Sequence, residues 1–205
     1  MFDKTTKATQ KKRSYDYDTE GLKDEELVLN YLHGYGHEVL ESEAMEDITL
    51  DIDAYLNGVA TSIKAQHAGV SINRRTGKPY NNIYFELCSQ HYSSHAWDDS
   101  LRSKMSRWDV PKRCRDFSYS TYNPSWFLTG GAQQYLILQG DRLRMYLKSD
   151  VEAVVFNQGF VRVLGLSQAV LKTQRGKNTI CGYLAIDDVP YVAEWTVKKP
   201  SEVAA

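Results

Sequence analysis

The sequence predicts a single α/β domain of the α+β kind, in which a central mixed sheet is flanked by helices. Three observations predict this class. Residues 22–35 repeat apolar side chains at helical spacing, residues 51–66 alternate around an Asn-Gly turn like a β-hairpin, and residues 134–147 form a second hairpin pattern that a helix signal follows. The chain of 205 residues is long enough for one domain with a sizeable core.

Composition narrows the class of protein. Hydrophobic residues make up 42% and charged residues 25%, as in soluble globular proteins, and no apolar run could cross a bilayer, so we expect no membrane partner. The N-terminus lacks the apolar segment of a secretory signal. The three cysteines (Cys88, Cys114 and Cys181) are odd in number and widely spaced, which predicts a reducing, cytoplasmic compartment. Because the formal net charge is −1, a nucleic acid would have to bind through local basic patches.

The predicted domain spans residues 20–200, between two polar ends. Residues 1–19 carry several basic residues and no apolar periodicity, which predicts a flexible basic arm. Such an arm either contacts phosphates or is an ordinary solvated tail, and both interpretations stay open. Residues 201–205 are expected to form a short tail.

The first predicted element is the helix at residues 22–35, which glycines follow as they do near C-caps. Acidic residues crowd its first turn, where carboxylates complement the helix dipole. One of them, Glu25, lies at the edge of the apolar stripe, from which it could face a site beside the sheet. A first strand at residues 37–40 and an acidic connection at residues 41–47 are expected next.

The hairpin at residues 51–66 carries the predicted site. Asn57-Gly58 is favoured in type I′ turns because both central residues need a positive φ. A two-residue loop pairs Leu56 with Val59, and the rest of the register follows from that pair. One face is then polar, with Asp51, Asp53, Ser62, Lys64 and Gln66. The other face is mostly apolar, with Ile52, Ala54, Leu56, Val59, Thr61, Ile63 and Ala65.

The polar face combines two carboxylates with an amine. In the predicted register Asp53 lies opposite Ser62, and Asp51 lies opposite Lys64. Carboxylate oxygens beside an ammonium group suit the binding of a metal ion and a phosphate. The alternative interpretation is an exposed cross-strand ion pair, which would stabilise the fold by well under ~1 kcal/mol.

Basic residues after the hairpin predict a nucleic-acid interface. A basic, glycine-containing loop spans residues 73–80, and the strand expected at residues 82–89 carries Glu86. Residues 91–115 interleave tryptophans with Arg and Lys, which suits either a nucleic-acid surface or a partly buried helix with a charged outer face. The predicted nucleic-acid-binding residues are Arg74, Arg75, Lys78, Arg102, Lys104, Arg107, Lys112 and Arg113.

The last third of the chain predicts a second hairpin and a short helix. Residues 125–128 are expected to begin a strand, and residues 134–139 are expected to pair with residues 142–147. Ser149 fits an N-cap, with Glu152 at the capping-box position. The apolar stretches at residues 161–166 and 180–186 are not assigned to an element.

This order of helix, strand, carboxylate-bearing hairpin and later strands resembles the PD-(D/E)xK nuclease superfamily, which has the restriction-endonuclease-like fold. In that family an Asp begins one strand of a hairpin, and an acidic residue and a Lys, one residue apart, follow on the next strand. Here Asp51 or Asp53 stands in the first position, and Ser62-Ile63-Lys64 stands where Glu-x-Lys is usual, so Ser62 replaces the acid. A second register places Gln66 where the Lys is usual. The resemblance covers residues 22 to about 155.

The resemblance implies a reaction and roles for individual residues. It implies a Mg²⁺- or Mn²⁺-dependent nuclease that hydrolyses DNA, in phage or mobile-element DNA processing within a bacterial or phage-infected host cell. Lys64 is the implied catalytic cation, Gln66 positions water or phosphate, and Glu25 or Glu86 supplies the missing carboxylate. The implied metal ligands are Asp51, Asp53 and Glu86. Nucleases of this type often pair to cut two strands, so a homodimer is an expected partner beside DNA.

Two alternatives belong to other classes of protein. With Ser62 in place of the acid, a nuclease fold that has lost its chemistry would be a DNA-binding or protein-interaction module. A chain with 14 tyrosines could instead be a structural protein that self-associates. The first alternative depends on whether a second carboxylate reaches Asp51 or Asp53 in space.

Overall fold

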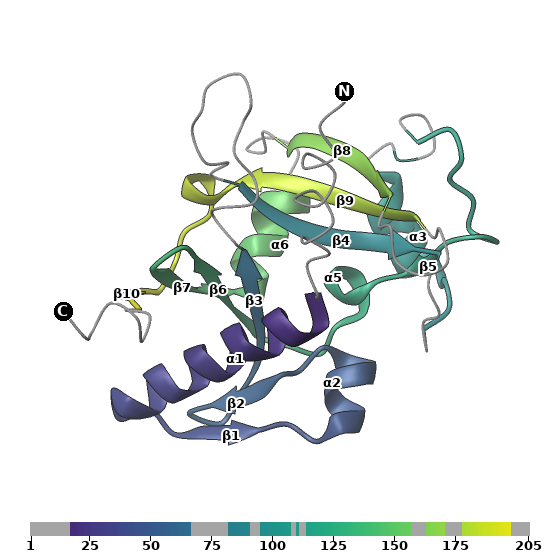
Figure 1. Ribbon diagram of the computed structural model, residues 1–205. Coiled ribbons are helices and arrows are strands. Elements are labelled where there is room, and N and C mark those ends of the chain that lie inside the picture. The colour runs from purple at the N-terminus through teal and green to yellow at the C-terminus, as the bar shows by residue number, and fades with distance from the viewer. Residues whose placement is uncertain are drawn as a thin grey trace, which may run out of the picture.

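The structure is a computed structural model that describes residues 17–66, 82–90, 95–107, 110, 114–156, 163–170 and 178–197. In it the chain forms two β-sheets with helices packed between and around them (Figure 1). The prediction of an α/β protein with a mixed sheet and flanking helices is confirmed, and the second sheet is an addition to it. No helix in these ranges combines the length and the apolar character of a membrane-spanning segment.

The six-stranded sheet is mixed and contains both predicted hairpins. Its strand order is β1-β2-β3-β6-β7-β10, in which β3 and β6 are parallel and all other neighbours are antiparallel. The strands are β1 (Val39–Glu41), β2 (Ala54–Leu56), β3 (Val59–Gln66), β6 (Gln134–Gln139), β7 (Arg142–Leu147) and β10 (Ala193–Thr196). The parallel pair joins the hairpins into one sheet and sets Ser62 opposite Tyr135.

The turn between β2 and β3 has the predicted geometry. Asn57 has a φ of 51° and Gly58 a φ of 78°, as a type I′ turn requires. Leu56 pairs with Val59, so the predicted register is confirmed. The ladder continues beyond β2, because the backbone N–H of Asp53 donates to the carbonyl of Thr61 at 2.9 Å.

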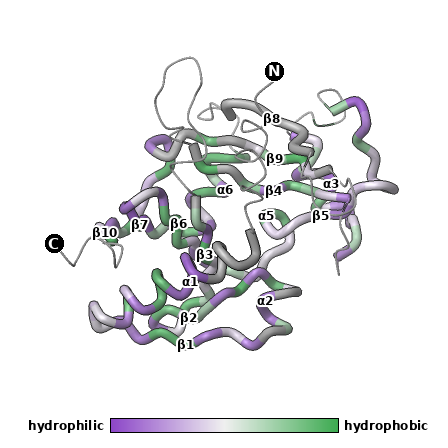
Figure 2. Tube along the Cα trace, in the orientation of Figure 1, coloured by the Kyte–Doolittle hydropathy of each residue, from purple (hydrophilic) through white to green (hydrophobic). Residues whose placement is uncertain are grey.

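Helix α1 (Tyr17–Gly34) covers one face of the mixed sheet. Apolar and polar residues alternate along its turns (Figure 2), and the buried Val28 and Leu32 pack against Ile63 and Leu136 of the central strands. The predicted helix is confirmed, but it begins at Tyr17, so residues 17–19 belong to the helix and not to a basic arm. Residues 1–16 lie outside the described part of the chain.

A four-stranded antiparallel sheet lies beyond the other face of the mixed sheet. Its order is β5-β4-β9-β8. The strands are β4 (Asn82–Ser89), β5 (Asn123–Pro124), β8 (Val163–Val170) and β9 (Asn178–Ala185). The later helical segments among the described residues are α3 (Asp99–Ser106), α5 (Trp126–Thr129), α6 (Lys148–Phe156) and the 3₁₀ turn η2 (Ile186–Asp188). The unassigned apolar stretches near residues 161–166 and 180–186 therefore contribute to β8 and β9.

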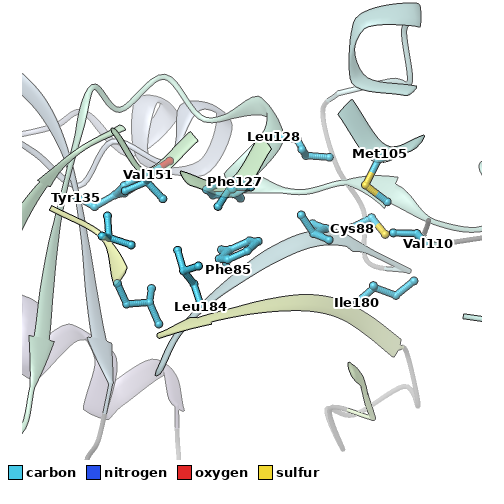
Figure 3. Close-up of a cluster of buried hydrophobic side chains, with 14 of the residues drawn as sticks. Phe85, Cys88, Met105, Val110, Phe127, Leu128, Tyr135, Val151, Ile180 and Leu184 are labelled. Carbon is cyan, nitrogen blue, oxygen red and sulfur yellow. The ribbon is translucent and has the colours of Figure 1, made fainter. Parts of the chain in front are cut away.

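The main hydrophobic core fills the space between the two sheets (Figure 3). Phe85 of β4 and Phe127 of α5 lie with ring centroids 4.5 Å apart, and Tyr135 and Leu184 join the same cluster from the two sheets. Gly182 on β9 makes room for this packing, since a Cβ at that position would overlap the ring of Phe85. This core fixes the second sheet and α5 relative to the mixed sheet.

Three predicted elements differ from the structure. The acidic connection at residues 41–47 is wrong in part, because helix α2 (Ala44–Leu50) begins there with a capping box between Glu43 and Glu46. The strand expected at residues 125–128 is wrong, because these residues form α5. A short apolar run does not distinguish a strand from a buried helical turn. Helix α6 begins at Lys148, directly after β7, so the predicted Ser149 N-cap is wrong.

The turn geometry predicts a difference between two glycine variants. A Cβ at Gly58 or at Gly34 would meet no atom within 4 Å, but only Gly58 has a positive φ. We expect Gly58→Ala to lower the free energy of unfolding by about 1 kcal/mol, because left-handed backbone is unfavourable for residues with a Cβ. Gly34 is the last residue of α1, so Gly34→Ala should leave the free energy of unfolding unchanged or raise it slightly. Chemical denaturation of both variants checks this, and equal effects would contradict the turn assignment.

Candidate active site

The candidate site lies where α2 ends and the hairpin begins. Asp51 caps α2 in the left-handed conformation, with a φ of 53°, and its backbone N–H donates to the carbonyl of Asp47 at 3.1 Å. Asp is among the residues that tolerate this conformation. The backbone of Gly130 and Gly131 approaches the same point: the N–H of Gly131 donates to the carbonyl of Leu50 at 2.6 Å. A side chain at Gly130 would collide with neighbouring carbonyl groups there.

The predicted polar face forms one connected network. The Lys64 Nζ lies 2.8 Å from Asp51 Oδ1 and 3.7 Å from Asp53 Oδ2. The Ser62 hydroxyl donates to Asp51 Oδ2 at 2.8 Å and lies 3.4 Å from Asp53 Oδ2. Asp53 also accepts a hydrogen bond from the backbone N–H of Ile63. Ser62, which stands in place of the acid of the motif, therefore holds both carboxylates in place.

This network is not an ordinary surface ion pair. The side chains of Lys64, Asp51 and Asp53 are 27%, 18% and 7% exposed, and Ser62 is fully buried. The Lys64 Nζ also lies 5.1 Å from the ring centroid of Trp126, a favourable cation–π distance. Burial raises the pKa of Asp51, and the Lys64 ammonium opposes that rise. Partly buried charges held by several contacts are typical of functional sites.

Glu25 of α1 faces this network. Burial, followed by the charges of Asp53 and Asp47, raises the pKa of Glu25 from 4.5 to about 7, and Lys64 partly opposes the rise. The helical phase of residues 22–35 had placed Glu25 at the edge of the apolar stripe, and in the structure this edge looks onto the end of the hairpin. A carboxyl group with a pKa near neutrality is suited to exchange protons or to bind a cation.

Asp47 is a site residue that the sequence analysis missed. Asp47 is exposed on α2, and its carboxyl group lies near that of Asp53. Partial burial, followed by the Asp53 charge, raises the pKa of Asp47. Two carboxylates so close repel each other, and a cation bound between them would relieve that repulsion. Residues 41–47 have the sequence pattern of an acidic connection, so no helical spacing pointed to Asp47; helix α2 carries it to the start of the hairpin.

Glu86 approaches the site from the opposite sheet. Its carboxylate accepts a hydrogen bond from the Ser125 hydroxyl and one from Ser89. Burial raises the pKa of Glu86, the two serine hydrogen bonds lower it, and the charges of Asp51 and Lys64 also act on it. Of the predicted site residues, Glu86 is the one that the second sheet contributes, through β4. Its serine contacts hold it beside the network but not in direct contact with Asp51.

Lys148 is a second residue that the sequence analysis missed. It is the first residue of α6, and its Nζ donates to the carbonyl of Gly130 at 2.5 Å. Burial lowers the pKa of Lys148, and the carboxylates of Glu152 and Asp51 oppose this shift. Lys104 of α3 lies close by and forms an ion pair with Glu152 at 3.4 Å. No sequence pattern signals this convergence, because three separate elements bring the groups together.

The carboxylate oxygens of this network are the kind of ligand that a hard divalent cation prefers. Glu25, Asp47, Asp51 and Asp53 gather around Lys64, and the neighbouring carboxyl groups of Asp47 and Asp53 are a place where a cation would offset like charge. Among the described residues, no three carboxylate, imidazole or thiolate groups converge in an arrangement that could hold a metal ion as they stand. The residues that could hold Mg²⁺ are Asp47 and Asp53, with Glu25 near them.

The remaining predicted residues are only partly described. The backbone of Gln66 pairs with Gln139 at the end of β3, but its side chain lies outside the described part. Arg102 and Lys104 lie on α3, and Arg107 follows the helix, with its guanidinium 5.9 Å from the ring centroid of Phe156. The other predicted nucleic-acid-binding residues lie outside the described residues: Arg74, Arg75, Lys78, Lys112 and Arg113.

Comparison of the chain with protein-family models, curated proteins and solved structures finds no significant match. The kinship with PD-(D/E)xK nucleases therefore stays a prediction from the residues. Since a fold alone does not determine an activity, the function has to be argued from the geometry of the site.

The raised pKa of Glu25 predicts how stability depends on pH. Between pH values near 4.5 and 7, the folded state keeps a proton that the unfolded state releases, so the free energy of unfolding should fall as pH rises through this window. We expect Glu25→Gln to be more stable than the wild type at pH 8, with the difference vanishing near pH 4. Thermal unfolding across this range checks it. Glu26→Gln, at the exposed neighbouring position, is the matched control, and identical pH profiles of the two variants would contradict the prediction.

Proposed function

We propose that this protein is a Mg²⁺- or Mn²⁺-dependent nuclease that hydrolyses phosphodiester bonds in DNA. The observation that carries the proposal is the half-buried network of Asp51, Asp53 and Lys64, to which α1 and α2 add Glu25 and Asp47. Several carboxylates around one ammonium group are what this hydrolysis needs, since it develops negative charge on phosphoryl, attacking and leaving oxygens.

The order of the elements supports the proposal. Helix α1, strand β1 and the β2–β3 hairpin precede the β6–β7 hairpin, and α6 follows. This is the order that the resemblance to PD-(D/E)xK nucleases implies for residues 22 to about 155. The parallel pairing of β3 with β6 makes the two hairpins one sheet, and the proposed catalytic residues lie at one end of it.

In the proposed mechanism the carboxylates bind the metal and the lysine acts on the phosphate. Asp53 and Asp47 would hold Mg²⁺, with Glu25 and Asp51 as further oxygen donors. Mg²⁺ held by these residues would supply an activated water and offset developing negative charge. Lys64, held by Asp51 at 2.8 Å and packed near Trp126, would donate a hydrogen bond to a phosphoryl oxygen or orient the attacking water.

Ser62 and Glu86 would act as positioning residues. The Ser62 hydroxyl donates to Asp51 and lies 3.4 Å from Asp53, so it fixes the relative placement of two carboxylates at the position where the family usually has a third. Glu25 and Asp47 would then supply, from the two helices, the negative charge that Ser62 does not carry. Glu86, anchored by Ser125, adds negative charge from the other side.

A basic surface next to the site supports DNA as the substrate. Lys104 and Arg107 both lie against the ring of Phe156, and Lys148 lies close to Lys104 at the start of α6. Of these cations, Lys148 also lies near Asp51. Phosphate contacts of this kind contribute affinity that does not depend on sequence.

The second candidate function is a DNA-binding or protein-interaction module without catalysis. Two observations favour it: Ser62 replaces the acid of the motif, and Lys64 is engaged with Asp51. The gathering of Asp47 and Glu25 near Asp53 argues against it, because several carboxyl groups around one point suit the binding of a hard cation.

Cleavage of a panel of plasmid, linear, branched and single-stranded DNA tests the proposal, with Mg²⁺, with Mn²⁺ and with a chelator. We expect Lys64→Ala to lower metal-dependent cleavage about 100-fold or more while DNA binding is retained, as when a group that stabilises transition-state charge is removed. Arg142→Ala, which removes an exposed cation at the far end of β7, is the charge-matched control. Unchanged cleavage in Lys64→Ala would refute the site, and no cleavage by folded wild type would favour the binding module.

Metal binding can be tested without any cleavage. We expect millimolar Mg²⁺ to raise the Tm of the wild type at pH 8 by a few degrees, because a ligand that binds only the folded state stabilises it. Asp47→Asn and Asp53→Asn should lose most of this shift, whereas Asp141→Asn, in the β6–β7 turn, should keep it. Differential scanning fluorimetry measures all four proteins, and an equal shift in every variant would rule out the proposed ligands.

A further inference from the structure

An open hollow lies beside the first turns of α3, away from the carboxylate network. Its volume is about 490 Å³, within the range of pockets that bind small ligands. The lining residues are Arg102, Phe117, Ser118, Tyr119 and Ser120. The hollow thus combines one cation, two aromatic rings and three hydroxyl groups, one of them phenolic, within a short stretch of surface.

Arg102 is arranged for stacking. Its guanidinium lies 4.8 Å from the ring centroid of Tyr119, and no carboxylate of the described residues forms an ion pair with it. A guanidinium that rests on an aromatic ring presents its other face and its N–H groups to a ligand. Arginine planes of this kind stack on nucleobases and donate to phosphates.

The platform under Arg102 is rigid. The ring of Tyr119 meets those of Trp97 and Phe117 edge to face, each at a centroid distance of 4.9 Å. The indole N–H of Trp97 donates to the carbonyl of Tyr122 at 2.7 Å, which fixes the cluster to the backbone. A preformed aromatic surface loses little conformational entropy when it binds.

Two serines provide a polar rim. The hydroxyl groups of Ser118 and Ser120 lie 2.7 Å apart, and the backbone N–H of Ser120 donates to the Ser118 hydroxyl at 3.2 Å. Each hydroxyl can both donate and accept, so the pair can hydrogen-bond to the edge of a base without selecting one base. The rim therefore suits a stacked base of any sequence.

The hollow is connected to the candidate site by short segments of chain. Tyr119 precedes Ser125, which holds Glu86, by six residues, so the two points are at most about 20 Å apart. A second link to the site runs through His95, two residues before Trp97 of the aromatic cluster. Its imidazole is hydrogen-bonded to the carbonyl of Thr49, near the end of α2. Trp126, which follows Ser125, lies with its ring centroid 5.1 Å from Lys64 Nζ, so a strand bound at Lys64 has a limited distance to cover to reach Arg102.

We propose that the Arg102–Tyr119 hollow binds an unpaired nucleotide of the substrate strand, with its base stacked on the Arg102 guanidinium. The inference rests on the proposed nuclease function and specifies its substrate: DNA with a single-stranded segment next to the scissile phosphate. A paired base within a duplex is already stacked on its neighbours and hydrogen-bonded, so its face is not available to Arg102. The hollow thus selects single-stranded, flapped or branched DNA over intact duplex.

The proposed subsite can be tested by measuring how tightly the protein binds fluorescently labelled single-stranded and duplex oligonucleotides. Fluorescence anisotropy in the presence of a chelator measures this binding without cleavage. We expect the wild type to prefer the single strand, and Arg102→Ala and Tyr119→Leu to weaken that binding about tenfold, as loss of one base stack would. Tyr119→Phe, which keeps the ring, should bind like the wild type. Arg115→Ala, at an exposed position nearby, is the charge-matched control.

Each outcome of this test decides the inference. Equal losses in Arg102→Ala and Arg115→Ala would overturn it, since they would show a purely electrostatic contact. So would equal affinity for single strand and duplex, or the absence of any nucleic-acid binding by the folded wild type. Thermal unfolding of each variant establishes that it is folded. If strand-selective binding is observed but no cleavage occurs under any metal condition, the subsite stands and the proposed catalytic function fails.

Discussion

The register of the β2–β3 hairpin is the constraint on which the candidate site depends. Positive φ angles at Asn57 and Gly58 impose a two-residue turn, which brings Asp51 and Asp53 against Ser62 and Lys64. Because side chains alternate along a strand, a shift of one residue would turn apolar side chains toward the carboxylates and Lys64 toward α1. The same turn thus determines both the hydrophobic face that packs under α1 and the polar face that could carry chemistry.

Several charged groups around this face lower the stability of the folded state at neutral pH. Burial and neighbouring carboxylates raise the pKa values of Glu25 and Asp47, and burial lowers that of Lys148. Groups held in this way weaken the fold at neutral pH, and two well-packed cores on either side of the sheet compensate. Such an arrangement is typical of a site that a cation or an anionic substrate completes, and it is the physical basis for the proposed nuclease.

The second sheet and the segments next to it bring further side chains to the candidate site. It presents Glu86 toward the hairpin, and the segment that leads from its edge strand β5 into α5 places Trp126 near Lys64. The stretch before β5 carries the aromatic cluster of Trp97, Phe117 and Tyr119. The carboxylate network and the proposed stacking surface therefore lie on neighbouring segments of the chain, which limits the distance between them.

The sequence by itself determined the features that depend on near neighbours: the turn, the strand register, the two faces of the hairpin, the second hairpin and the phase of α1 that turns Glu25 inward. The tertiary structure alone decided the rest. Asp47 meets Asp53 because the end of α2 lies beside the start of the hairpin, and Lys148 approaches Asp51 because β7 continues directly into α6. Local periodicity and turn preference can be read along a chain, whereas contacts between elements far apart in sequence depend on how their apolar faces pack.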